Sequence, residues 1–224
     1  MDSLFTLVTA VEEEKFTDSK EDILKFLKII GVDTRFVSLT DNKIYINNLR
    51  FSKFSRTREK TFYKQYPEIR VVRSSLFMKI CSKTSKVLAG SLYPGVRLHI
   101  PDDNEFLKIV LEPYTRKYGV KIVQNDYDFI VSPLILDDEV NNIFSDIFTG
   151  TGIDFSRRNP KEIYPLITTE KEWILSFCEI ENITFTSKNK NNPLAGDFMN
   201  FLEDVAPQYR ENVIKACDYL KDKN

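Results

Sequence analysis

The chain has 224 residues, of which 42% are hydrophobic and 29% charged, and its formal net charge is −1. A chain of this length can bury a core without disulfides or metal ions, and the composition excludes a disordered or collagen-like protein. Three widely spaced cysteines without a CxxC pair exclude a disulfide framework and a zinc ribbon, so we expect no metal site. The uncharged apolar stretches are too short to span a bilayer, so we expect no membrane contact.

The first eleven residues are apolar but lack the basic start of a signal peptide, and they predict a strand and a cytoplasmic protein. Ser19 and the acidic residues after it open a helix over residues 20–30, whose apolar positions keep helical spacing until Gly31. Residues 35–39 and 43–46 flank a polar turn and predict a β-hairpin. These elements predict a small α+β N-terminal unit over residues 1–94, ending where turn residues cluster at 90–95.

Charge is concentrated between Arg50 and Lys86, where eleven basic residues stand against two acidic ones. Aromatic residues are interleaved with these charges, and this mixture is typical of a surface that binds a phosphate backbone and stacks on bases. The candidate RNA contacts are Arg50, Lys53, Arg56, Arg58, Lys60, Lys64, Arg70 and Arg73. The alternative is a solvated surface whose aromatic rings (Phe51, Phe54, Phe62, Tyr63 and Tyr66) turn into the core.

From residue 95 the pattern changes to alternating strands and helices. Strands are expected at 96–100, 120–123, 128–131 and 163–167. Helices are expected at 105–118, with a bend at Pro113, and at 137–148, 198–205 and 208–220. A further helix is expected to begin after a capping box at Thr169. The only histidine, His99, lies in the first of these strands, and we expect no chemical role for it. The prediction is an α/β class protein whose 95–224 domain is a Rossmann-like, mostly parallel sheet with flanking helices.

Parallel sheets bind ligands beyond the carboxyl ends of their strands. Two loops are expected there, residues 101–104 and residues 132–138. The second loop ends in Asp137 and Asp138, which either contact a ligand or stabilise the first turn of the following helix.

Residues 132–140 (SPLILDDEV), followed by an amphipathic helix and the Thr149–Gly152 turn, resemble the second conserved region of the PP-loop ATPases that modify tRNA. The Tyr164–Ile167 segment and the acid-started helix after it also resemble that family, and the likeness covers roughly residues 128–220. If nucleotide binding is retained, the resemblance implies that Asp137, Asp138, Gly150 and Gly152 take part in it, with ATP and Mg²⁺ as ligands.

The sequence departs from the family where ATP would be held. Active members carry an SGGxDS-type loop, but residues 101–105 here contain no glycine and three acids, which repel phosphate. The family's histidine is replaced by the Ser132-Pro133 turn. The resemblance therefore implies a catalytically silent member with no catalytic residues, similar to the accessory subunit of wobble-uridine thiolation.

Three functions remain open from the sequence. The first is a non-catalytic PP-loop-like subunit that contacts tRNA and assists an active PP-loop partner protein. The second is an ATP-dependent adenylating enzyme that needs Mg²⁺ beside its acids. The third is a protein-interaction scaffold whose basic segment meets an acidic partner surface and no RNA.

Overall fold

The computed structural model describes residues 19–101, 103–154, 158–187, 192–206 and 208–221. The strand expected in the first eleven residues lies outside this description. Among the described residues, no helix combines the length and the apolar character that crossing a lipid bilayer requires.

The N-terminal unit begins with the helix and hairpin that the sequence predicts. Ser19 caps α1 (Lys20–Ile29) by accepting a hydrogen bond from the backbone N–H of Asp22. A 3₁₀ turn η1 (Thr34–Phe36) leads into β1 (Val37–Leu39), which pairs antiparallel with β2 (Lys43–Ile46). After α2 (Leu49–Ser52) and α3 (Arg56–Gln65), β3 (Arg70–Val72) joins the other side of β2 in parallel.

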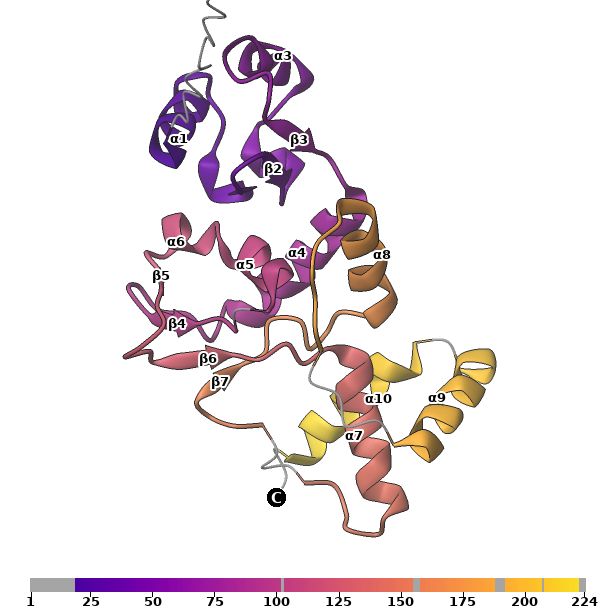
Figure 1. The fold of residues 1–224 in the computed structure, drawn as a ribbon. Coiled ribbons are helices and arrows are strands. Elements are labelled where there is room, and N and C mark those ends of the chain that lie inside the picture. The colour runs from indigo at the N-terminus through magenta and orange to yellow at the C-terminus, as the bar shows by residue number, and fades with distance from the viewer. Residues whose placement is uncertain (1–18, 102, 155–157, 188–191, 207, 222–224) are drawn as a thin grey trace, which may run out of the picture.

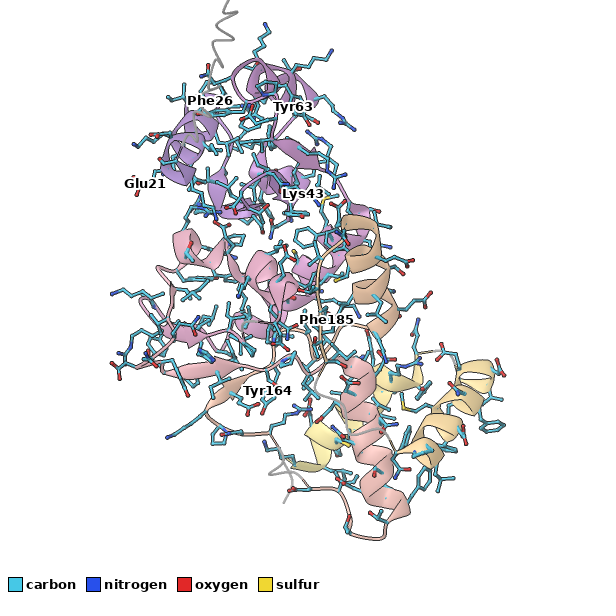
Figure 2. The ribbon with its side chains drawn as sticks, viewed as in Figure 1. Glu21, Phe26, Lys43, Tyr63, Tyr164 and Phe185 are labelled. Carbon is cyan, nitrogen blue, oxygen red and sulfur yellow. The ribbon has the colours of Figure 1, made fainter. Side chains whose placement is uncertain are left out.

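The core of this unit lies between its sheet and helices α1 and α3. Leu27 of α1, Ile44 of β2 and Phe62 of α3 are fully buried in it. Figure 2 labels Phe26 on α1 and Tyr63 on α3, and the Phe26 ring packs against Phe62 with centroids 6.4 Å apart. The unit thus buries aromatic side chains that come from the basic segment.

The rest of the chain forms the predicted α/β architecture (Figure 1). All four strands of its sheet are parallel, in the order β5-β4-β6-β7. The strands are β4 (Arg97–His99), β5 (Lys121–Ile122), β6 (Phe129–Val131) and β7 (Glu162–Ile163). The helices are α4 (Ser75–Leu88), α5 (Glu105–Leu111), α6 (Tyr114–Lys117), α7 (Leu136–Phe148), α8 (Lys171–Glu181), α9 (Pro193–Val205) and α10 (Tyr209–Lys221).

The main core joins this sheet to α4, α5 and α8. Phe77 of α4 stacks on Phe177 of α8 with centroids 4.8 Å apart, and Phe106 of α5 packs against both rings. Helices α7, α9 and α10 share a separate cluster around Val140. The main core also includes Tyr45 of β2 and Val72 of β3, so the two larger clusters do not divide the chain at one point, and the domain limits 1–94 and 95–224 stay a prediction.

Four local features differ from the sequence expectation. The strand expected at 163–167 ends already at Ile163, and the helix expected at 198–205 begins earlier, at Pro193. The helix expected at 105–118 is interrupted at Pro113 and forms α5 and α6, because proline cannot donate a helical hydrogen bond. The capping box at Thr169 is wrong: α8 is preceded by Glu170, which makes no side-chain cap bond. The Thr169 side chain is instead fully buried, and its carbonyl accepts from the N–H of Leu136.

The N-terminal unit is tied to the rest of the chain by polar contacts. Lys43 of β2, labelled in Figure 2, donates to the backbone carbonyl of Glu181 at 2.8 Å and to its carboxylate at 3.1 Å. On the neighbouring strand β1, the carbonyl of Val37 accepts from the Arg116 guanidinium at 2.7 Å. These contacts fix the orientation of the basic segment relative to the parallel sheet.

Candidate functional site

The parallel sheet reverses its strand order between β4 and β6. In the sequence β4 comes first, but β5 lies on one side of it and β6 on the other. Ligands of open α/β proteins bind at this reversal, beyond the carboxyl ends of the two strands. The loops after β4 and β6 follow these strand ends directly, as the sequence predicts.

The loop after β4 is closed by the chain itself. Asn104 is buried, and its side-chain amide bonds to both backbone polar groups of Thr186. The N–H of Phe106, in the first turn of α5, donates to the carbonyl of Thr184 at 3.2 Å. Phe185, labelled in Figure 2, packs its ring edge-on against Phe106 at 5.8 Å. The N–H of Phe106, which could donate to a phosphate at this end of the helix, is therefore already hydrogen-bonded.

Asp137, at the start of α7, holds neighbouring helices in place. Its carboxylate accepts from the N–H of Lys171 at 2.6 Å, which caps the start of α8. Its other oxygen lies 2.9 Å from Nε of Arg210 on α10. These contacts engage Asp137 with α8 and α10, whereas the sequence alternative concerned the first turn of α7, in which Asp137 also lies.

Asp138 is only 1% exposed, and one of its carboxylate oxygens has no hydrogen-bond partner among the described residues. Burial raises the pKa of Asp138 to about 6, although a hydrogen bond with the Ser187 side chain and the charge of Lys171 oppose the shift. An acid with this pKa is partly protonated near neutrality. Among the carboxyl groups at this edge of the sheet, Asp138 has the most strongly shifted pKa, and shifted pKa values also occur at functional sites.

Gly150 and Gly152 lie at the other end of α7. Both adopt positive φ angles, 73° and 75°, in the turn that ends the helix. Since α7 has 13 residues, this turn is about 20 Å from Asp137 and Asp138. The two acids are consecutive residues, and the structure does not join the glycines to them in one site.

A cavity of about 430 Å³ opens beside the carboxyl ends of β6 and β7. Ser132 lines it on the β6 side, and Tyr164, labelled in Figure 2, lines it after β7. Glu139 of α7 is buried in its wall and pairs with Nε of Arg158 at 3.1 Å. The sequence analysis missed this pair, because Arg158 lies in an irregular segment where periodicity gives no signal.

The structure divides the basic segment into cations that are paired within the protein and cations that are not. Arg73 and Arg56 pair with the buried Glu59 at 2.7 Å and 3.2 Å. Arg70 pairs with Glu181, and the Arg58 guanidinium donates to the carbonyl of Lys53. Four predicted RNA contacts are exposed and form no ion pair in the described part of the chain: Arg50, Lys53, Lys60 and Lys64.

The aromatic residues of the segment are divided in the same way. Phe54, Phe62 and Tyr66 are buried, so the alternative of rings turned into the core holds for them. The hydroxyl of Tyr63 accepts from the N–H of Val71. Phe51 is 52% exposed and is the ring of this segment that a base could reach.

The cysteines do not fit a metal cluster. Cys81 and Cys178 are buried in the main core and Cys217 in the cluster of α7, α9 and α10. Burial raises the pKa of the Cys81 and Cys178 thiols, that of Cys178 to about 12, which disfavours the thiolate that binds metal. Within the described ranges, no three His, Cys, Asp or Glu side chains are grouped to hold a metal ion.

The chain matches no protein-family model and no curated protein. Solved structures do match, and one of them is the U34-tRNA thiolase NcsA from Methanococcus maripaludis with its 4Fe-4S cluster. The match covers 70% of this chain and 83% of that chain at 13% identity, with a TM-score of 0.50. This likeness shows the fold alone, a Rossmann-like parallel sheet with flanking helices.

Proposed function

We propose that the protein is a non-catalytic PP-loop-like subunit that assists tRNA modification of the thiolation type and contacts RNA through its N-terminal unit. The observation that carries the proposal is the closed turn after β4. There the N–H of Phe106 is bonded to Thr184 and the side chain of Asn104 to Thr186. A phosphate would have to displace these bonds and approach Glu105, whose carboxylate accepts from the N–H of Thr184 at 3.4 Å.

The cysteines support a non-catalytic role, since they do not fit the cluster that the matched thiolase carries. The residues at the sheet edge do not fit ATP either, because Asp137 is occupied by Lys171 and Arg210. In this proposal an active partner protein supplies the chemistry in the cytoplasm. The subunit contributes RNA contacts.

The exposed cations of α2 and α3 support the RNA contact. Arg50, Lys60 and Lys64 extend into solvent, and none of them forms an ion pair with a described acid. Each cation of this kind that meets a phosphate releases a bound counterion, which makes the affinity steeply dependent on salt.

The experiment is filter binding of the purified full chain to a tRNA pool across a salt series. The test variant changes Arg50, Lys60 and Lys64 to Ala, and the matched control changes Lys161, Lys215 and Lys221, which lie outside the N-terminal unit. We expect binding that weakens with salt, with a log–log slope that is smaller by about 2 to 3 in the test variant and unchanged in the control.

Two results would contradict the proposal. If the wild-type protein does not bind tRNA in low salt, the RNA contact is wrong. If both triple variants lose the same affinity, the binding reflects overall charge and no specific surface. Salt-sensitive binding to an acidic protein but not to tRNA would favour the scaffold function instead.

A further inference from the structure

A groove of about 460 Å³ lies between the N-terminal unit and helices α4 to α6. Phe36 and Phe51 line it from the N-terminal unit, Lys86 from α4, and Lys117 from α6. Among the described residues that line the groove there is no aspartate or glutamate. The groove thus combines aromatic rings with positive charge and no acid.

The two phenylalanine rings form a platform at one wall. Their centroids are 5.2 Å apart with an angle of 32° between the planes. Phe51 remains 52% exposed, whereas Phe54 three residues later is fully buried. A large ring held against a second ring and open to solvent suits a flat π-system, because bases stack on aromatic side chains whatever their sequence.

Two lysines line the same groove as the platform. Nζ of Lys117 lies 5.6 Å from the centroid of Phe36 and 5.1 Å from that of Tyr118. Lys86 is exposed on α4, and neither lysine forms an ion pair with a described acid. The guanidinium of Arg50 lies 5.9 Å from the centroid of the Phe51 ring.

Two polar side chains that line the groove, Asn47 and Cys81, are hydrogen-bonded within the protein. Asn47 donates its side-chain amide to the Cys81 sulfur at 3.4 Å and accepts from the Ser38 hydroxyl at 3.1 Å. These polar groups are therefore not available to read the edge of a base. Recognition would depend on stacking and on phosphate charge, which favours an unpaired nucleotide of any sequence.

We propose that this groove binds an unpaired nucleotide of the RNA, with its base stacked on Phe51 and its flanking phosphates beside Lys86 and Lys117. The inference rests on the proposed function, since it adds a subsite to the RNA surface of α2 and α3. Arg50 connects the two, because it belongs to that surface and lies over the Phe51 ring.

The test measures fluorescence anisotropy with three labelled probes: a ten-nucleotide oligouridylate, a blunt RNA duplex, and a ten-residue oligoglutamate. The variants are Phe51→Ala, Phe51→Leu and Lys117→Ala, all in the full chain. Phe201→Ala is the matched aromatic control, because Phe201 is 60% exposed on α9, and Lys161→Ala is the cation control. Thermal unfolding of each variant confirms that it is folded.

We expect both Phe51 variants to lose roughly 10-fold in affinity for the oligouridylate without a change in salt slope, since the lost contact is uncharged. Lys117→Ala should lower the salt slope by about 0.7. Duplex binding should be unaffected by the Phe51 variants, and both controls should behave as wild type. Phe51→Leu keeps apolar volume, so it separates loss of the ring from loss of packing.

If the wild-type protein binds tRNA but the Phe51 and Lys117 variants bind the oligouridylate unchanged, the groove inference is wrong and the proposed function stands. Tighter binding of oligoglutamate than of oligouridylate would also overturn it, in favour of an acidic protein segment. If the wild-type protein binds neither tRNA nor the oligouridylate, the proposed function and the inference fall together.

Discussion

Both ends of the Asn104 side-chain amide are bonded to the backbone of Thr186. Nδ2 donates to the carbonyl oxygen at 3.1 Å, and Oδ1 accepts from the N–H at 3.2 Å. Asn104 precedes α5 and Thr186 follows α8, so this pair closes the turn where the PP-loop proteins that the sequence resembles hold ATP.

Replacing Asn104 with Ala should lower the free energy of unfolding by about 1 to 3 kcal/mol, because two hydrogen bonds at a buried residue are lost. Urea unfolding followed by circular dichroism measures this change. Asn125→Ala is the control, since Asn125 is exposed in the loop before β6 and should change stability by less than about 0.5 kcal/mol. A loss as small for Asn104 as for Asn125 would show that the turn is not held closed by this side chain.

Asp138 should make the folded protein more stable at acidic than at alkaline pH. Its pKa is raised to about 6 in the folded state, whereas an unfolded aspartate titrates near 3.9. Between these values the folded state binds more protons, so this group's contribution falls as pH rises from about 4 through 6. Asp138→Asn should remove that pH dependence and stabilise the protein at pH 8.

Urea midpoints of wild type and Asp138→Asn, compared from pH 4 to 8, test this directly. Asp204→Asn is the control, because Asp204 is exposed on α9 and its substitution should leave the pH profile unchanged. A variant that is less stable than wild type at pH 8 would mean that the ionised carboxylate is needed by the fold.

ATP should not stabilise the protein. A ligand that binds the folded state raises the melting temperature, and the closed turn after β4 already uses the Phe106 amide that phosphate would need at that helix end. With about 5 mM ATP and Mg²⁺ we expect a shift smaller than about 1 °C in differential scanning fluorimetry. A shift of several degrees that disappears in Asp138→Ala would instead favour the adenylating enzyme.

The α/β architecture could be predicted from the sequence because its signals are local. The apolar spacing from Val140 to Phe148 determines one face of α7, and Ser19 marks the start of α1 within one turn. Thr169 misled for an equally local reason: its spacing to Glu172 fits a capping box, but the burial of its side chain depends on packing that no spacing reveals.

The roles of the charged residues could not be predicted in this way. Arg70 is paired with Glu181, which is 111 positions later in the chain, and a local charge count treats that arginine as free. The groove is equally hidden, since Phe36, Phe51 and Lys117 lie in three separate stretches. Phe51 is exposed and Phe54 is buried, and this difference follows from tertiary packing alone.

The contacts that join the two halves also bear on self-association. β1 is one of the two edge strands of the three-stranded sheet, and an edge strand with free polar groups can recruit a strand from another molecule. Here Arg116 covers the carbonyl of Val37, and the Glu112 carboxylate accepts from the N–H of Leu39 at 3.2 Å. The α5 and α6 region thus blocks strand addition at β1. An N-terminal half separated from these helices would expose the backbone polar groups of β1 and could pair with a strand of another molecule.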